Sequence, residues 1–436
     1  MTGRGGKSGH PILRVSRVRD FRLLWIGQSL SLLGDQFYMI ALPWLVLQVT
    51  GSALALGTVL ALEAIPRALF VLVGGAVTDR VSARTVMLVS DVARLMMTAL
   101  LTVLVFTGGM NLWMIYGFAL AFGLVDGFFA PATASIVPHI VDGDDLQTGN
   151  ALVHGAGQLS VFVGPVLAGI LIAVGSTVSS AVPETGGIGL AFAIDTATFL
   201  VSVVTLCMMG TMASSMPDEA SEQQGHVLAS IRGGISYMWN DATLRTMFVL
   251  VAAVNFLVNG PFLVGIPVLA DSRLPEGAAA FGLIVSAHGG GNLLGFVLSG
   301  AIPSARRLNI IIPAVFALFG IGIASLGFVG STAVAFMLVL VMGIGNGYIS
   351  IVLITWLQKR TAKSMLGRLM SLVMVASAGL LPVSEAISGV VIGLSLPGLF
   401  AGAGVLLILV ALWAAVLPEM RSLKLEMGEE AVATTS

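Results

Sequence analysis

Charged residues are scarce in this chain of 436 residues. Lys, Arg, Asp and Glu make up 10% of it, hydrophobic residues make up 57%, and the mean hydropathy is +1.00. Soluble domains carry about 25% charged residues. Most of this chain therefore cannot face water, and its length does not indicate a series of soluble domains.

Cysteine and the motifs of several enzyme classes are also scarce. The single cysteine, Cys207, lies in an apolar run, which excludes an intramolecular disulfide and a cysteine-based metal site. We find no Walker phosphate loop, no nucleophile elbow and no nucleic-acid motif, and Gly289-Gly290-Gly291 falls in an apolar run where glycines favour helix packing. We therefore expect no enzymatic activity, no ATP-driven step, no metal or other cofactor, and no nucleic-acid partner.

The chain contains instead a series of long apolar runs. A membrane-spanning helix needs about 20 mostly apolar residues, and these runs are too long for barrel strands. The first run exceeds the core of a signal peptide and lacks a clear cleavage site, so we interpret it as a span. The predicted fold is an all-α membrane protein with twelve transmembrane helices, at 22–48, 53–77, 85–106, 111–132, 150–174, 188–210, 246–270, 279–301, 308–328, 331–355, 367–392 and 394–417.

The basic residues divide unevenly between the two sets of loops. Of the 21 Lys and Arg residues, only Arg273 falls in a loop on one side, and only Arg67 and Arg94 fall within spans. Basic residues gather on the cytoplasmic side of membrane proteins. The sequence therefore predicts a multi-pass protein of the cell (plasma or inner) membrane with both termini in the cytoplasm.

The longest polar stretch divides the chain in two. It covers residues 211–245 and includes an amphipathic segment from Leu228 to Trp239. A shift of about 225 residues places the first span on the seventh, which predicts two six-helix pseudo-repeats with a substrate site between them at the midplane. The predicted parts are a cytoplasmic tail at 1–20, an N-terminal bundle at 21–210, a cytoplasmic linker at 211–245, a C-terminal bundle at 246–418 and a cytoplasmic tail at 419–436.

Two short motifs carry a resemblance to a known family. Gly75, Asp79, Arg80 and Arg84 follow the pattern Gly-x-x-x-Asp-Arg-x-x-x-Arg, with Ser82 where glycine is usual. This pattern resembles the loop-two signature of the major facilitator superfamily. The run Gly164-Pro165-Val166-Leu167-Ala168-Gly169 is similar to the Gly-Pro-x-x-Gly-Gly antiporter motif of drug exporters, with Ala168 in place of one glycine.

Three further stretches narrow the resemblance to one branch. They are Leu33-Gly34-Asp35 with Ala41-Leu42-Pro43-Trp44, Asn255-Phe256 with Gly260-Pro261, and Thr355-Trp356-Leu357-Gln358 with Gly367-Arg368-Leu369-Met370. Over residues 20–418 the chain resembles the twelve-span drug:proton antiporter branch, which includes macrolide exporters and the enterobactin exporter. The resemblance implies a multidrug efflux transporter that works by alternating access, exchanges protons for substrate, and contributes to antibiotic resistance. We expect a monomer in the lipid bilayer.

The loop-two motif also has a physical interpretation. Asp79 can cap a neighbouring helix N-terminus, and Arg80 and Arg84 can pair with acids at adjacent helix ends, for which Asp126 is the best candidate. Such a cluster, with Gly75, would latch the two halves in one conformation. The alternative is that basic residues simply hold the loop in the cytoplasm.

The antiporter motif suggests a bend in the fifth span. Pro165 removes a backbone donor and bends its helix, while Gly164 and Gly169 allow a neighbouring helix to approach closely. Ordinary helix packing explains the same residues.

Acids within the predicted spans are the candidates for proton transport. A charge at mid-bilayer costs about 2.5–3.5 kcal/mol on insertion scales, so each one is a functional hypothesis. Asp35, about 20 Å along the first span, has no basic residue within one turn and is the first candidate; a structural acid bonded to Gln36 or Ser31 is the alternative. Glu63 is the second, and an ion pair with Arg67 at i+4 would keep it ionised and make it a poorer carrier.

The remaining polar residues of the spans have weaker assignments. Asp91 with Arg94, and Asp195, are expected to be structural on peripheral spans, and His288 is expected to pack. For a substrate cavity we select residues that offer an apolar wall, amides or titratable groups, namely Phe37, Trp44, Arg67, His154, Gln158, Asn255, Asn259 and Glu385.

The sequence therefore favours a proton-coupled exporter of lipophilic or amphipathic small molecules. A dedicated exporter of one natural product, such as a siderophore or a macrolide, remains open, as does a lysophospholipid transporter. A membrane sensor built on a transporter scaffold would show no substrate-coupled flux.

Overall fold

A computed structural model describes residues 11–78, 80–178, 185–210, 238–302, 308–361 and 363–422. These residues form helices joined by short loops, with no strand among them. The long helices of the first half are α2 (Arg19–Thr50), α3 (Ala53–Thr78), α4 (Ala83–Phe106), α5 (Leu112–Ile136), α6 (Leu146–Val178) and α7 (Gly186–Met208). Those of the second half are α9 (Ala242–Val254), the π-helix η4 (Asn255–Asn259), α10 (Gly260–Arg273), α11 (Ala278–Ala301), α12 (Leu308–Leu326), α13 (Thr332–Arg360), α14 (Lys363–Leu394) and α15 (Leu396–Val416).

The prediction of an all-α membrane protein with twelve spans is confirmed. In the described part of the chain, eleven helical segments are long and apolar enough to cross a membrane, and Gly379–Leu394 of α14 is a shorter apolar stretch. The seventh span is made of α9, η4 and α10 in succession. The short elements α1 (Pro11–Arg17), η1 (Val137–His139), η2 (Gly143–Asp145) and α16 (Pro418–Ser422) lie outside these spans.

Polar residues begin several of the helices. Ser82 accepts a hydrogen bond from the Thr85 N–H at the start of α4, and Asn111 accepts one from the Met114 N–H at the start of α5. Such caps satisfy backbone donors that have no partner within a helix. Helix α2 ends at Gly51, whose φ of 59° lies in the left-handed region that glycine adopts without strain.

Asp241 caps α9 and also ties it to α13. Its carboxylate accepts hydrogen bonds from the Thr243 and Leu244 N–H groups, and Arg360 Nη2 donates to it at 3.0 Å. Burial raises the pKa of Asp241, but these donors outweigh burial and hold the pKa below its ordinary value. The ionised form of Asp241 therefore stabilises this end of the second half.

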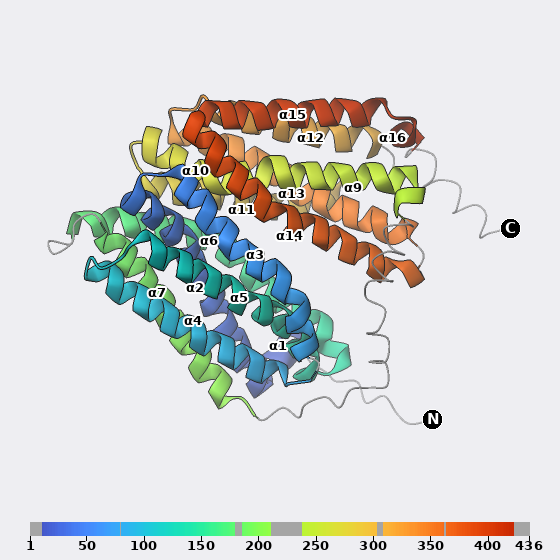
Figure 1. The fold of residues 1–436 in the computed structure, drawn as a ribbon. Coiled ribbons are helices and arrows are strands. Elements are labelled where there is room, and N and C mark those ends of the chain that lie inside the picture. Colours follow the sequence, from blue (N-terminus) through green and yellow to red (C-terminus); the bar gives the residue numbers. More distant parts are fainter. Residues whose placement is uncertain are drawn as a thin grey trace, which may run out of the picture.

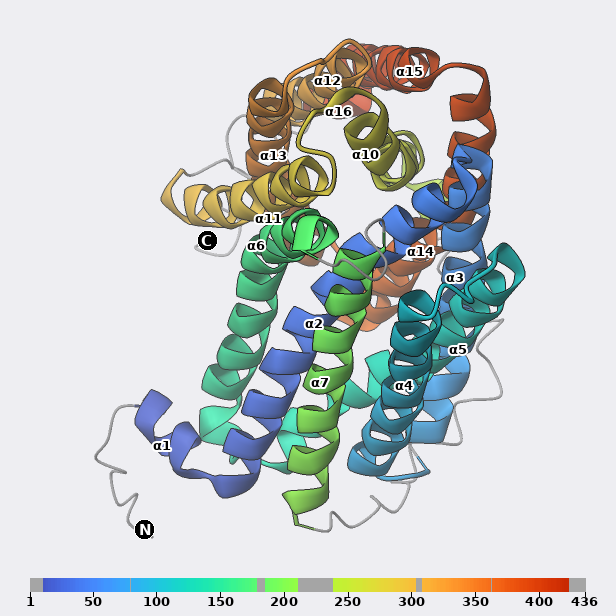
Figure 2. The ribbon, with the colours of Figure 1, turned by 90° about the vertical axis from the view of Figure 1, so that its left-hand side faces the viewer.

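The helices of each half contact one another extensively (Figures 1 and 2). In the first half α2 packs on α6 and α7, α3 packs on α5, and α4 packs on α7 and α5. In the second half α11 packs on α13, α12 on α15, and α10 on α14. Two seams join the halves, one between α6 and α11 and the other between α3 and α14.

Because the number of spans is even, α2 begins and α15 ends at the same end of the molecule, which we call the tail end. The seams lie toward the opposite end, where glycines let the backbones touch. A Cβ on Gly57 would lie 2.6 Å from the Glu385 carbonyl oxygen, and a Cβ on Gly169 would lie 2.5 Å from that of Ala278. Gln48 of α2 also donates to Asp271 of α10 at 3.1 Å. From this contact region the helices of the two halves diverge toward the tail end (Figure 1).

The expected amphipathic segment from Leu228 to Trp239 lies outside the described residues except at its last two positions, Met238 and Trp239. The boundaries of the two bundles, the linker and the tails stay predictions.

Candidate functional site

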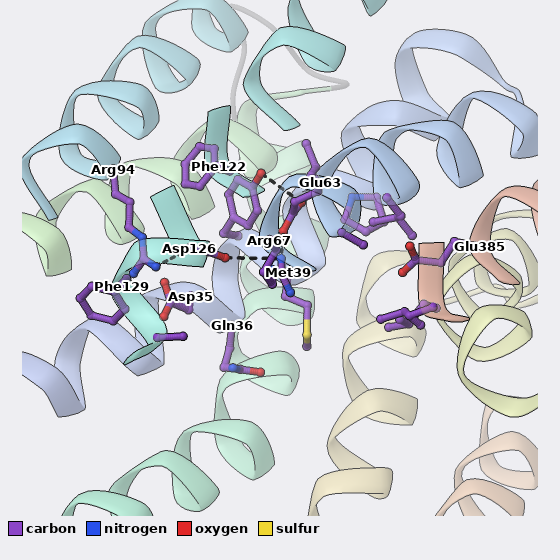
Figure 3. A pocket seen from close by; sticks show the side chains of 18 of the residues that line it. Asp35, Gln36, Met39, Glu63, Arg67, Arg94, Phe122, Asp126, Phe129 and Glu385 are labelled. Atoms are coloured by element: carbon purple, nitrogen blue, oxygen red, sulfur yellow. Dashed lines mark hydrogen bonds and ion pairs between the residues drawn. The ribbon is translucent and has the colours of Figure 1, made fainter. Parts of the chain in front are cut away.

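A cavity of about 390 Å³ lies between the two halves (Figure 3). Most of its wall comes from α2, α3, α4 and α5, and the second half contributes one residue of α10 and two of α14. The lining residues are Leu32, Asp35, Gln36, Tyr38, Met39, Leu42, Pro43, Leu60, Glu63, Ala64, Arg67, Arg94, Phe122, Asp126, Phe129, Ala130, Leu263, Leu381 and Glu385. The wall therefore combines an apolar surface with a small set of charged groups.

Helical spacing explains which side chains reach the cavity. On α2 the lining residues Leu32, Asp35 and Met39 recur every three to four positions, which places them on one face. On α3 the same spacing aligns Leu60, Glu63 and Arg67. The sequence thus brings an acid of α2 and an ion pair of α3 to one cavity.

Two arginines and two acids form a continuous network beside this cavity. Arg67 donates to Glu63 on the same helix face, and its Nη2 lies 3.4 Å from Asp126 Oδ2 of α5. Asp126 Oδ1 accepts a hydrogen bond from Arg94 of α4. The Tyr38 hydroxyl lies 3.5 Å from Glu63 Oε2, at the outer limit of a hydrogen bond. Asp126 thereby joins the two arginines (Figure 3).

Acids outnumber bases in the cavity wall. Asp35, Glu63, Asp126 and Glu385 line it, against Arg67 and Arg94. Within the described part of the chain, no ion pair involves Asp35 or Glu385, and Glu385 Oε2 is buried without a hydrogen-bond partner. A buried carboxylate without a partner is costly, and Glu385 is such a group in this cavity.

The structure brings some of the expected cavity residues to this site and not others. Asp35, Glu63, Arg67 and Glu385 line it. Phe37 and Trp44 are instead buried in the apolar core, and His154 and Gln158 of α6 do not line the cavity. Asn255 and Asn259 also lie outside its wall, where Asn259 Nδ2 donates to Asn255 Oδ1 within the π-helix.

Asp126 does not pair with the loop-two arginines as expected. It lies ten residues before the end of α5 at Ile136, hence about 15 Å from that end, and it binds Arg67 and Arg94 inside the span. Arg84 instead donates to the carbonyl oxygens of Leu206 and Cys207, at 2.8 and 3.1 Å, near the C-terminal end of α7. A cation at that end donates to carbonyl groups that have no partner within the helix, and it interacts favourably with the helix dipole.

The other members of the expected latch are Gly75, Asp79 and Arg80. Asp79 lies outside the described residues. A Cβ on Gly75 would meet open space, and Arg80 is exposed in the turn that follows α3. The latch stays a prediction.

The antiporter motif lies in the seam between α6 and α11. The Val166 N–H, which follows Pro165, donates at 2.9 Å to the Ser286 hydroxyl of α11. A Cβ on Gly164 would lie 2.5 Å from the Gln36 side chain, so this glycine lets α2 approach. The motif therefore contacts both the cavity helix α2 and the opposite half.

Sequence reasoning missed the position of Arg94. Its span was expected at the periphery, but the side chain is buried and reaches the cavity wall. The signal was present in α4, because Met87, Arg94, Thr98 and Leu101 fall on one buried stripe that faces the bundle. The expected pair with Asp91 exists at 4.0 Å, but the closer partner of Arg94 is Asp126.

No metal site is evident in the described ranges, where no group of three or more His, Cys, Asp or Glu side chains could hold an ion.

Comparisons with known proteins agree with this architecture. The family model described as Major Facilitator Superfamily matches residues 24–384. Macrolide efflux protein A of Streptococcus pyogenes is 21% identical over 418 residues, which cover 93% of this chain and 98% of that protein. Multidrug efflux pump Tap of Mycobacterium tuberculosis is 26% identical over 357 residues, with 79% and 80% covered.

The Tap protein of Mycolicibacterium fortuitum is 28% identical over 236 residues, and this chain spans about half of its length, 54%. Among solved structures, nucleoside transporter NupG has a TM-score of 0.70 at 11% identity, with 91% of this chain and 98% of that chain covered. A bacterial homologue of the iron transporter ferroportin, in its inward-facing state, has a TM-score of 0.66 at 18% identity, with 92% and 100% covered. These likenesses show the fold.

A helical fold with a cavity between two bundles and a family match over most of the length lead to one assignment. The chain belongs to the major facilitator superfamily and is a multi-pass membrane transporter of small molecules, not an enzyme.

Proposed function

We propose that the protein is a proton-coupled exporter of lipophilic or amphipathic small molecules, in particular cations. The observation that carries this proposal is the excess of acids in an otherwise apolar cavity between the two halves. The relatives named multidrug efflux pump and macrolide efflux protein support export as the direction of transport.

The apolar wall suits the body of such a substrate. Leu32, Met39, Leu60, Phe122 and Leu381 offer aliphatic and aromatic surface on several sides. Ligand sites of this kind combine a hydrophobic lining with a few placed polar groups. Here the polar groups carry more negative than positive charge, which favours a cation.

In the proposed cycle, the substrate and a proton compete for the acids of the cavity. A cation enters while Asp35 gives its proton to water, which moves a single proton and leaves a carboxylate beside the cation. The halves then reopen on the other side, a proton binds Asp35 again, and the substrate leaves. Glu63 acts in the same cavity, but its pair with Arg67 makes it the poorer proton carrier.

The tail end is proposed to face the cytoplasm, with the protein in the plasma or inner membrane. The positive-inside distribution of Lys and Arg supports this orientation. Because the seams between the halves lie toward the other end, the conformation described here would be open to the cytoplasm, as loading of an exported substrate requires.

The test is proton flux in everted membrane vesicles, with tetraphenylphosphonium, erythromycin, a siderophore and a lysophospholipid added in turn. The wild type is expected to move protons when tetraphenylphosphonium is added, and Asp35→Asn is expected to abolish that response. Glu276→Gln is the matched control, because Glu276 is an exposed acid in the loop before α11, outside the cavity.

The panel also separates the alternatives. A proton response to erythromycin alone would favour a dedicated macrolide exporter. The similarity to macrolide efflux protein A is the reason to include this compound. Lysophospholipid movement without proton flux would favour a lipid transporter. No proton response to any compound, with protein present in the membrane, would rule out proton-coupled export.

A further inference from the structure

Arg94 has an unusual hydrogen-bond inventory for a buried arginine. Its side chain is 5% exposed, and its Nη2 donates to Asp126. Its guanidinium carbon lies 4.0 Å from the centroid of the Phe129 ring and 5.7 Å from that of Phe199. The Nε and Nη1 groups are buried without a hydrogen-bond partner among the described residues.

Unpaired donors on a buried guanidinium are expensive. A guanidinium has five N–H donors in a rigid plane, and a buried charged donor without an acceptor costs more than a neutral one. The closest other acid is Asp91, whose Oδ1 lies 4.0 Å from Nη1, beyond hydrogen-bond distance. Asp91 Oδ2 is already occupied by the Ser202 hydroxyl at 2.6 Å. Arg94 thus binds one carboxylate through Nη2, and its Nε and Nη1 donors are unused.

Asp35 is the acid in the best position to accept hydrogen bonds from these unused donors. Asp35, Arg94 and Phe129 line the same part of the cavity wall, where Figure 3 labels all three. Among the charged groups around Asp35, Arg94 exerts the largest electrostatic effect. Asp35 has no ion pair with any described residue in this conformation.

We propose that Arg94 is a positioning residue that exchanges carboxylates during transport. It binds Asp126 while Asp35 is protonated, and it donates hydrogen bonds to Asp35 when Asp35 ionises. This inference rests on the proposed proton coupling through Asp35. The exchange moves no atom other than the proton that Asp35 gives to water.

The exchange would connect the proton site to the second acid of the cavity. When Arg94 turns away, Asp126 is left with Arg67, whose Nη2 is already 3.4 Å from Asp126 Oδ2. Asp126 then competes more strongly with Glu63 for Arg67, and Arg67 binds Glu63 less tightly. Loss of the proton from Asp35 therefore frees Glu63, so that both acids become available to a cation together.

The other titratable groups around Asp35 do not offer an equivalent switch. They are Asp195 on α7, Asp91 on α4, Asp126 on α5 and Arg67 on α3. All but Arg67 are acids, and Arg67 is already bound to Glu63. Of the two described arginines near Asp35, Arg94 is the one whose Nε and Nη1 groups are buried without a hydrogen-bond partner.

The test compares Arg94→Lys with Arg67→Lys in purified protein. Both variants keep the positive charge on a side chain that binds Asp126, but lysine has a single ammonium group and cannot donate to two carboxylates from separate nitrogens as arginine can. Proton release on addition of tetraphenylphosphonium is followed with a pH-sensitive dye as the starting pH is varied. Thermal unfolding is measured on the same samples to establish that each variant is folded.

Arg94→Lys is expected to raise the pH midpoint of proton release by about one to two units, the effect of one charge-assisted hydrogen bond to ionised Asp35. Arg67→Lys is expected to leave that midpoint in place. A midpoint for Arg94→Lys equal to that of the wild type would show a static charge and overturn the exchange.

If Arg94→Lys does not fold, Asp126→Asn is the second variant. It releases Arg94 to Asp35 and is expected to lower the midpoint; a midpoint that rises or does not move would also overturn the exchange. A wild type that releases no proton at all would refute the proposed function instead, so the two failures are distinguishable.

Discussion

Substitution of Gly169 by alanine tests whether the glycine seam holds the two halves together. Gly169 lies on α6, and a Cβ at this position would be 2.5 Å from the Ala278 carbonyl oxygen on α11. Ordinary van der Waals contact begins at 3.4 Å, so the two backbones must separate by about 0.9 Å to admit the methyl group. Helix α11 belongs to the other half, so the strain falls on the contact between halves.

The magnitude follows from the cost of overpacking. Extra methyl groups in a tightly packed site cost about 1–3 kcal/mol. The same penalty applied only to the conformation with this seam closed shifts its population by about 5- to 150-fold. We therefore expect Gly169→Ala to populate a conformation in which the halves are apart at the end opposite to the tails.

The assay is a distance measurement between spin labels. Trp113 at the start of α5 and Phe328 after α12 are 80% and 74% exposed, lie toward that end on different halves, and can be replaced by labelled cysteines. The native Cys207 is exposed and is first changed to serine. The wild type should give one distance, and Gly169→Ala should add a longer one.

Gly155→Ala is the matched control on the same helix. A Cβ there would meet open space, so the substitution adds the same helix propensity without a clash. Equal distance distributions for Gly169→Ala and Gly155→Ala would refute the idea that this seam controls the conformation.

Further predictions concern hydrogen bonds and ion pairs at other positions. Ser286→Ala removes the acceptor of a backbone N–H across the seam. It should favour the conformation with the longer spin-label distance by about 1 kcal/mol; an unchanged population would exclude that hydrogen bond as a latch. Arg67→Gln should lower the melting temperature by leaving Glu63 unpaired, and adding Glu63→Gln should recover part of the loss, which a double-mutant cycle measures. Asp241→Asn should lower the melting temperature at neutral pH by removing the bond from Arg360. Because the pKa of Asp241 is lowered by folding, this difference is present above the unfolded-state pKa and should shrink as the pH falls through the folded-state pKa; a difference independent of pH would contradict that assignment.

Most of the fold could be predicted from the sequence because it depends on composition over long windows. Runs of about 20 apolar residues require helices in a membrane, and the structure has a helix for each predicted span. The division of the seventh span by a π-helix at Asn255–Asn259 could not be predicted, since it depends on local hydrogen-bond register and not on hydropathy.

The site was predictable only in part. Asp35 and Glu63 stand out because a charge inside a span is rare, and both line the cavity. The partners of those charges were not predictable, because they come from other helices: Asp126 was assigned to the loop-two arginines but binds Arg67 and Arg94. Contacts between residues of different helices depend on helix rotation and tilt, which one sequence does not specify.

We propose above that an acid of this cavity exchanges a proton for substrate. The most direct measurement is the number of protons released per tetraphenylphosphonium bound by the purified protein, for the wild type, Asp35→Asn and Glu63→Gln. We predict release by the wild type, none by Asp35→Asn with tetraphenylphosphonium still bound, and residual release by Glu63→Gln. Equal proton release by the wild type and Asp35→Asn would contradict the account.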